Sequence, residues 1–229
     1  MQTIISGTCH LMAILALTDG STSLMPALRE YVAQRAGEFG EIPADRKGQL
    51  QQVADFVREQ LQAGKPARLT FICTHNSRRS QMAQIWAQTA AGYYGIANVE
   101  TFSGGTEATA FNPRAVAALK RAGFEIPDAT TDANPHYRVS FAKDADPLDC
   151  FSKVYKASPN PKSDFCAVIA CSEADKKCPL VQGAARRLAI PYDDPKAFDG
   201  TPEETAKYDE RCRQIAREML YVFSRVTPQ

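Results

Sequence analysis

The stretch Leu69–Ser80, LTFICTHNSRRS, is an apolar run that ends in a cysteine and is followed by a polar turn with two arginines and a serine. Residues 67–73, ARLTFIC, have the β-branched and aromatic composition of a buried strand. Residues 79–94 have the composition of a helix. Cys73 is therefore expected at the end of a strand, with five residues between it and Arg79 at the start of a helix.

A loop between a strand and a helix can turn successive backbone N–H groups and the positive end of the helix toward one tetrahedral oxyanion. The same field favours the thiolate form of a cysteine, so Cys73 is the expected nucleophile. Arg79 can hold two oxyanion oxygens with its planar fork. Ser80 can donate its hydroxyl to the sulfur, and Asn76 tolerates the left-handed backbone of a tight loop. The alternative is a buried core thiol followed by a solvated helix start at Arg78.

Strand and helix patterns alternate outward from this stretch. We expect strands at residues 67–73, 98–105, 165–171 and 186–192, and helices at residues 79–94, 112–124 and from Pro202 to about Val226. This alternation indicates an α/β protein with a parallel sheet covered by helices. Between these elements, Tyr137–Ala142 and Phe151–Tyr155 have the composition of two strands joined by the turn KDADPLD, which predicts an inserted hairpin or lid.

The chain divides into three regions. Residues 1–24 are expected to be a disordered leader, because the first convincing pattern begins at Met25. Apolar residues recur with helical period over residues 26–39 and 43–63, so residues 25–66 are expected to form a helical extension that packs on the main domain. Residues 67–229 form that main domain, with an insertion at about residues 134–165.

Composition limits the possible partners and compartments. The chain has 229 residues, 44% of them hydrophobic, and 27 basic against 26 acidic side chains, which gives a net charge of +1. This balance argues against nucleic acid or a membrane as the main partner. The seven cysteines are irregularly spaced and odd in number, which favours reduced thiols and a cytoplasmic protein over a disulfide scaffold. No basic residue precedes the short apolar run near the start, so neither a signal peptide nor an anchor is expected.

These segments resemble the low-molecular-weight protein tyrosine phosphatases and, among them, the thioredoxin-coupled arsenate reductases, over roughly residues 67–226. FICTHNSRRSQMAQIW resembles the phosphate loop and first helix, and FSGGTE and NPRAVAALKRAGFEI resemble the segments that follow. CSEADKKCP and YDDPKAF resemble two later signatures. The resemblance implies a three-layer α/β/α fold with a mostly parallel four-stranded sheet.

The resemblance also implies roles for individual residues. Cys73 attacks the oxyanion, and Asp194, held at a turn by the proline after it, is the acid, with Asp193 as the weaker candidate. Cys171 then attacks the sulfur of Cys73, and Cys178 attacks Cys171 to leave a disulfide for thioredoxin. The oxyanion would be bound by residues Thr74, His75, Asn76, Ser77, Arg78, Arg79 and Ser80.

Other interpretations of the cysteine pair are two unrelated buried thiols, or a zinc site with Cys166 or Cys150. The C-x4-C-x6-C spacing lacks the short pairs of structural zinc sites, so no metal is expected, and no cofactor either. The sequence also departs from the family in the loop itself. His75 replaces the usual glycine, and Arg78 replaces the cysteine typical of relatives.

Three functions are therefore open. The first is reduction of arsenate to arsenite through Cys73, Cys171 and Cys178. The second is hydrolysis of phosphomonoesters, as by a tyrosine phosphatase. Aromatic residues of the insertion could then bind an aryl ester, or they could form the core of the lid. These residues are Tyr137, Phe141, Phe151 and Tyr155. The third is a non-catalytic oxyanion or redox sensor, which would bind phosphate and turn nothing over.

Overall fold

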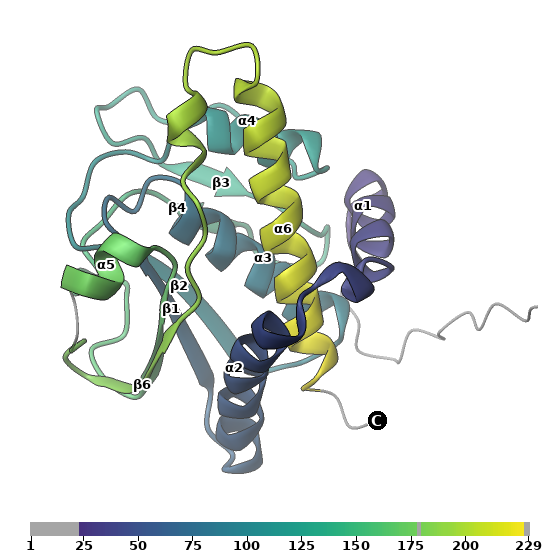
Figure 1. The fold of residues 1–229 in the computed structure, drawn as a ribbon, viewed down its shortest axis with the longest axis vertical. Coiled ribbons are helices and arrows are strands. Elements are labelled where there is room, and N and C mark those ends of the chain that lie inside the picture. Colours follow the sequence, from purple (N-terminus) through teal and green to yellow (C-terminus); the bar gives the residue numbers. More distant parts are fainter. Residues whose placement is uncertain (1–22, 178–179, 227–229) are drawn as a thin grey trace, which may run out of the picture.

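A four-stranded parallel sheet forms the centre of the molecule (Figure 1). The structure, a computed structural model, describes residues 23–177 and 180–226. The strands are β1 (Ala67–Cys73), β2 (Val99–Gly105), β5 (Phe165–Ile169) and β6 (Ala184–Ala189), paired in the order β2-β1-β5-β6. This confirms the expected α/β class and parallel sheet. The strand order reverses between β1 and β5, and in such sheets the crevice at that point receives the ligand.

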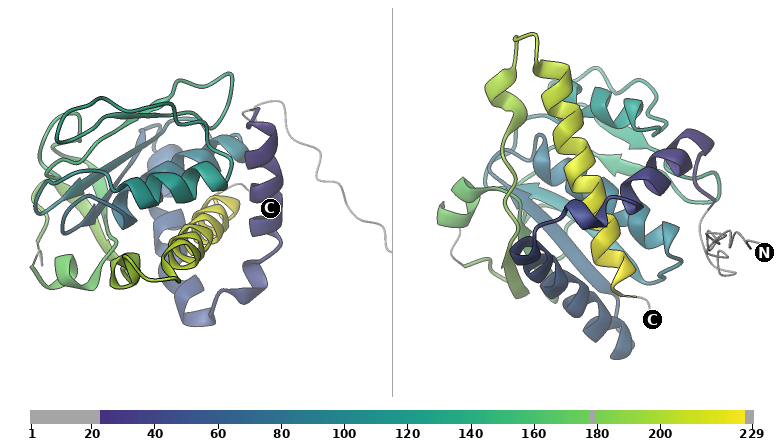
Figure 2. Two further views of the ribbon diagram at one scale, coloured as in Figure 1. Left: turned by 90° about the horizontal axis from the view of Figure 1, so that it is seen from above. Right: turned by 45° about the vertical axis from the view of Figure 1, so that its right-hand side comes forward.

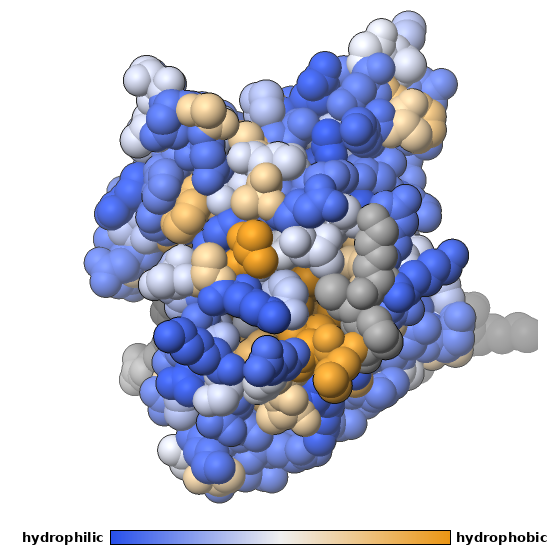
Figure 3. Space-filling model, turned by 90° about the vertical axis from the view of Figure 1, so that its left-hand side faces the viewer, coloured by the Kyte–Doolittle hydropathy of each residue, from blue (hydrophilic) through white to orange (hydrophobic). Residues whose placement is uncertain are grey.

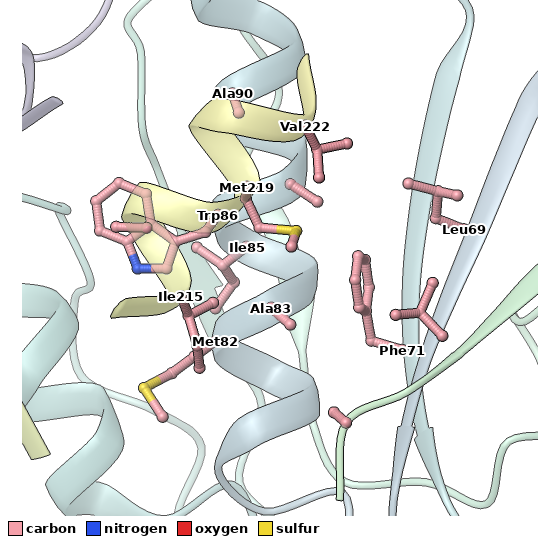
Figure 4. Close-up of a cluster of buried hydrophobic side chains, with 14 of the residues drawn as sticks. Leu69, Phe71, Met82, Ala83, Ile85, Trp86, Ala90, Ile215, Met219 and Val222 are labelled. Carbon is pink, nitrogen blue, oxygen red and sulfur yellow. The ribbon is translucent and has the colours of Figure 1, made fainter. Parts of the chain in front are cut away.

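Three helices build the main layer beside the sheet. α3 (Arg79–Tyr93) packs on β1 and β2, and α2 (Ala44–Gln62) packs on β1, β5 and β6. α6 (Glu204–Ser224) packs against both helices. Figure 4 shows Leu69 and Phe71 of β1 facing α3, with Met219 of α6 beside them. Thr70 and Ile72, which alternate with those residues along the strand, are equally buried, so β1 is covered on both faces.

The remaining helices surround this core. α1 (Pro26–Ala36) and α4 (Pro113–Arg121) lie against α6 (Figure 2). The shorter elements are η1 (Phe39–Glu41), α5 (Ser172–Lys177) and η2 (Pro195–Phe198). Asn112 caps α4 by accepting a hydrogen bond from the N–H of Arg114 at 2.9 Å, as its position before Pro113 indicates. Within the described ranges, no helix has both the length and the apolar character needed to cross a bilayer.

The two helices that precede the sheet share its hydrophobic core. Tyr31 of α1 stacks on Trp86 of α3 with ring centroids 5.5 Å apart. Arg46 of α2 pairs with the buried Glu218 of α6 at 2.8 Å. The apolar side chains that the two helices bury are Leu28, Val32, Leu50, Val53, Ala54, Phe56 and Val57. The expected leader falls outside the described residues except for Ser23 and Leu24, and Leu24 is buried and bridges to Ala142.

The insertion contains a short antiparallel pair, β3 (Tyr137–Val139) and β4 (Leu148–Cys150). The expected position of its second strand, Phe151–Tyr155, was wrong. Those residues instead lie along the end of β2, where Gly105 donates its N–H to the carbonyl of Lys153 at 2.8 Å and accepts the N–H of Tyr155 at 2.9 Å. The composition of the segment did indicate extended backbone, but its partner is β2 rather than β3.

Candidate active site

The loop between β1 and α3 holds Cys73 at the carboxyl edge of the sheet. Cys73 is 3% exposed, and Asn76 adopts the left-handed backbone with φ of 46°. The backbone N–H groups of residues 75–79 have no acceptor among the described residues. Unpaired backbone donors gathered in one loop at the start of a helix can bind an acceptor from outside the chain.

The thiol is joined to the loop through Ser80. The sulfur of Cys73 lies 3.1 Å from Ser80 Oγ, and Asn76 donates its amide N–H to the same oxygen at 2.9 Å. Because Asn76 supplies a proton to that oxygen, the hydroxyl proton of Ser80 is free to point at the sulfur. The expected contact between Ser80 and the thiol is therefore present in the geometry.

Arg79 connects the loop with the segment after β6. Its Nη1 donates to the carbonyl of Tyr192 at 3.0 Å, and its Nη2 donates to Asp194 Oδ2 at 2.7 Å. The Nε of Arg79 is buried and has no partner among the described residues. One edge of the guanidinium is therefore used to hold the later segment, and Nε remains a free donor for an anion.

The neighbouring aspartates Asp193 and Asp194 differ in exposure and in hydrogen bonding. Asp194 caps η2 by accepting the N–H of Lys196 at 3.1 Å, and its other oxygen faces Arg79. Asp193 has a side chain that is 97% exposed, with Arg211 at 3.5 Å. Asp194 is thus the carboxyl at the rim of the thiol loop, and Asp193 points to solvent.

Arg78 is held on the other side of the loop by α6. Its Nε donates to the hydroxyl of Tyr208 at 2.9 Å, and that hydroxyl donates to Asp199 at 2.8 Å. Burial raises the pKa of Tyr208 to about 12, helped by its hydrogen bond to Asp199, so the hydroxyl stays protonated. Arg78 also lies 3.9 Å from Asp194. The contacts of Arg78 with Tyr208 and Asp199 could not be predicted from the sequence, because both partners lie far from Arg78 along the chain.

A small, shallow pocket opens over the thiol, lined by Cys73, His75, Ser77, Arg78, Arg79 and Asp194. Of the other loop residues expected to bind the oxyanion, Thr74, Asn76 and Ser80 have side chains directed into the protein rather than toward this pocket. None of the insertion's aromatic residues lines it. Phe141 is buried, Tyr137 packs on Phe111, and Phe151 stacks on His136, so these three rings are used in packing contacts.

Cys171 lies beside the thiol loop. It is fully buried, its sulfur is 3.6 Å from Thr74 Oγ1, and it accepts the N–H of Ala174 at 3.3 Å. Arg187 of β6 holds the short helix α5 that follows, with Nη2 2.5 Å from Asp175 Oδ1. Cys178, the other member of the expected relay, lies outside the described residues.

Cys150 and Cys166, the other cysteines considered as zinc ligands, are both buried. Burial raises the pKa of the Cys150 and Cys166 thiols to about 12, so both remain neutral thiols. Among the described residues, no group of three or more His, Cys, Asp or Glu side chains has the arrangement of a metal site.

Comparison with known proteins links this geometry to one family. Residues 68–137 match the family model of the low molecular weight phosphotyrosine protein phosphatases. The arsenate reductase of Bacillus subtilis is 33% identical over 154 residues, which cover 67% of this chain and 92% of that protein. The arsenate reductase of Brevibacillus brevis is 37% identical over 126 residues, which cover 55% of this chain and 74% of that protein. A solved arsenate reductase in a phosphate-binding state is 15% identical, with a TM-score of 0.46 over 70% of this chain and 99% of that one.

Proposed function

Because the chain belongs to the low-molecular-weight protein tyrosine phosphatase superfamily, close to its arsenate reductases, we propose that it reduces arsenate to arsenite at Cys73. The observation that carries the proposal is the set of unpaired donors beside the thiol. The N–H groups of residues 75–79 and the Nε of Arg79 have no acceptor among the described residues. A small tetrahedral oxyanion, with acceptors on every side, is the ligand that such a set binds best.

In the proposed first step, arsenate oxygens accept hydrogen bonds from the loop and from Arg79. The Cys73 thiolate attacks arsenic, and one oxygen leaves as water. Asp194 supplies the proton for that oxygen, which its position at the rim of the pocket supports. The product of this step is an adduct with a bond between arsenic and the sulfur of Cys73.

The second step transfers electrons. Cys171 attacks the sulfur of Cys73, and arsenite leaves with the electron pair of the arsenic–sulfur bond, so two thiols are oxidised as arsenic is reduced. Cys178 then attacks Cys171 and releases Cys73 as a thiolate. The net change is arsenate plus two thiols to arsenite, water and a disulfide. The position of Cys171, whose sulfur lies 3.6 Å from the hydroxyl of Thr74 next to Cys73, supports this order.

The Cys171–Cys178 disulfide must be reduced from outside, and we propose thioredoxin as the donor. A protein donor needs a surface to contact beside the disulfide. Figure 3 shows an apolar patch framed by hydrophilic surface on the face of the molecule that carries α5. Leu180, shortly after α5 in the sequence, is 83% exposed and would add an apolar side chain to such a contact surface.

Hydrolysis of phosphomonoesters is the second candidate, and the carboxyl of Asp194 favours it. Phosphoester cleavage needs an acid for the leaving oxygen and one thiolate, and both are present at the pocket. The absence of aromatic side chains from the pocket lining argues against a dedicated phosphotyrosine site. We therefore expect slow hydrolysis of simple aryl phosphates as a side activity of the arsenate site.

The experiment that tests the proposal compares two cysteine variants with the parent. Cys178→Ser should abolish multiple-turnover arsenate reduction with thioredoxin, thioredoxin reductase and NADPH, while it retains hydrolysis of p-nitrophenyl phosphate. Cys73→Ser should lose both activities, because the nucleophile is gone. Cys9→Ser is the control, since this cysteine lies outside the region matched to the reductases, and it should behave as the parent.

Two outcomes contradict the proposal. If Cys178→Ser reduces arsenate at the parental multiple-turnover rate, the relay through Cys178 is wrong. If Cys73→Ser retains either activity, the active site lies elsewhere.

A further inference from the structure

The insertion touches the thiol loop through one short segment, Phe151–Lys153, which we call the strap. Ser152 Oγ donates to the carbonyl of His75 at 2.9 Å and accepts the N–H of Thr109 at 2.9 Å. Ser152 is 1% exposed, so these bonds form away from solvent. The strap therefore holds the backbone of the loop at the position where relatives have a glycine.

A second bond connects the strap with the nucleophile. The N–H of Lys153 donates to Asn76 Oδ1 at 2.9 Å. Asn76 donates in turn to Ser80 Oγ, which lies 3.1 Å from the sulfur of Cys73. The strap is thus the outer end of a hydrogen-bonded path that ends at the thiol.

Two glycines of β2 make room for this arrangement. A Cβ on Gly104 would lie 2.3 Å from the Cα of Tyr155, and a Cβ on Gly105 would lie 2.6 Å from the carbonyl oxygen of Thr74. Both distances are far below van der Waals contact. The backbone of the inserted segment, β2 and the thiol loop can therefore pack together only because side chains are absent at these two positions.

The strap also buries a positive charge. Lys153 is 5% exposed, and its Nζ lies 3.4 Å from the carbonyl of Phe151 and 4.4 Å from the centre of the Phe151 ring. Among the described residues it has no carboxylate partner. Burial lowers the pKa of the Lys153 ammonium, while Cys150 and Asp149 oppose that shift. Burying a cation without a paired carboxylate is costly, and the carbonyl and ring of Phe151 offset part of that cost.

The ammonium is close to the loop through shared contacts. The carbonyl of Phe151 also accepts the side-chain N–H of Gln81 at 2.8 Å. The same Gln81 amide donates to the backbone carbonyl and the side-chain oxygen of Asn76. The ammonium of Lys153 is therefore linked to Asn76 of the loop through two groups, the carbonyl of Phe151 and the side-chain amide of Gln81.

We propose that the strap is a working part of the oxyanion site, in which Ser152 positions the loop backbone and Lys153 supplies a buried positive charge behind it. The inference rests on the proposed function only in that the loop binds an oxyanion. A small anion is held more tightly when its donors are fixed in advance and when a nearby charge is poorly screened. Both residues are positioning residues, since neither lines the pocket.

The test measures anion binding without reference to turnover. The probe is inorganic phosphate, and the readout is the protection of Cys73 from alkylation by iodoacetamide as phosphate is titrated. Ser152→Ala and Lys153→Met should each weaken phosphate binding by about three- to tenfold, the loss expected for one hydrogen bond or one partly screened charge. Lys153→Met should do so without lowering the melting temperature, because an apolar side chain replaces a buried charge.

Two exposed residues of the insertion are the matched controls, Ser163→Ala and Lys162→Met, and both should bind phosphate as the parent does. If Lys153→Met binds phosphate with the parental affinity, the proposed role of the Lys153 charge is wrong. If Ser152→Ala does so, the proposed role of the Ser152 hydroxyl is wrong. If Ser152→Ala fails to fold, Lys153→Met still decides whether the strap acts on the anion. A parent that reduces no arsenate, yet is protected by phosphate, would contradict the proposed function and leave the strap intact. A parent that phosphate does not protect would contradict both.

Discussion

Arg79 is the residue on which the two halves of the site depend, because it faces the thiol loop and Asp194 at once. Its Nη1 and Nη2 hold the segment after β6, and its Nε is left for the anion. An arginine can divide its donors in this way because they are fixed in one plane, whereas a lysine presents a single charged centre. The spacing of Cys73 and Arg79 predicted the proposed anion site, but the contact of Arg79 with Tyr192 could not be predicted from the sequence.

Asp194 and Asp193 form a natural pair for testing the acid. Asp194→Asn should lower kcat for p-nitrophenyl phosphate by about a hundredfold or more, the usual contribution of a positioned acid. Phosphate binding should change little, because Arg79 Nε and the loop remain. Asp193→Asn is the control and should keep the parental kcat, since the side chain of Asp193 is 97% exposed and faces Arg211. Steady-state kinetics of the Asp194→Asn and Asp193→Asn variants provide the measurement. Equal losses in the two variants would remove Asp194 as the acid.

At the residue scale, contacts within one loop could be predicted from the sequence, and contacts between distant parts of the chain could not. Cys73, Asn76 and Ser80 could be predicted as a unit, because they lie within one loop and its helix start. Ser152 and Tyr208 could not, because each reaches the loop from a remote part of the chain. Thr74 stays a predicted oxyanion-binding residue, and its side chain lies 3.6 Å from the sulfur of Cys171.

At the scale of elements, the strands and long helices could be predicted because their apolar residues recur with a clear period. The bounds of α3 and α4 also lie close to the predicted ones. For α4, Asn112 and Pro113 mark the start of the helix in the sequence. The second strand of the insertion could not be placed correctly. Phe151–Tyr155 has strand composition, but composition does not say which neighbour supplies the hydrogen bonds, and here that neighbour is Gly105.

The helix α5 must change shape during the proposed cycle. The six residues of α5, Ser172–Lys177, lie between Cys171 and Cys178 in the chain. Six residues of intact helix rise about 9 Å, whereas a disulfide needs Cα atoms within about 7 Å, so we propose that part of α5 unwinds when the two cysteines are joined. Arg187 opposes this change by holding Asp175 with its guanidinium.

Asp175→Asn should weaken that hold and speed disulfide formation. The pair is partly exposed, so we expect a modest effect of about two- to fivefold, as for surface ion pairs worth up to 1 kcal/mol. The measurement is the single-turnover rate at which arsenate removes free thiols, followed by quenching and thiol counting. Glu173→Gln, on the same helix and exposed, is the control and should match the parent. A rate unchanged in Asp175→Asn would show that α5 opening does not limit the relay.

At the scale of the whole molecule, the helices before the sheet are part of the fold's core. Phe56 of α2 is 2% exposed. Phe56→Ala should lower the free energy of unfolding by about 3–5 kcal/mol, the usual cost of removing a buried aromatic ring. Urea denaturation monitored by circular dichroism measures this loss. Gln52→Ala, on the exposed face of the same helix, should change it by less than about 0.5 kcal/mol. Equal stability of parent and Phe56→Ala would mean that α2 packs only loosely.

The site around Cys73 depends on segments of the chain that the ribosome synthesises at very different times. The thiol loop is made early, the strap follows some seventy residues later, and Tyr208, which holds Arg78, comes near the end. A growing chain would thus carry the nucleophile long before it could hold an anion. If the site binds phosphate as we propose, cellular phosphate would bind only the finished protein, and by mass action it would favour completion of folding.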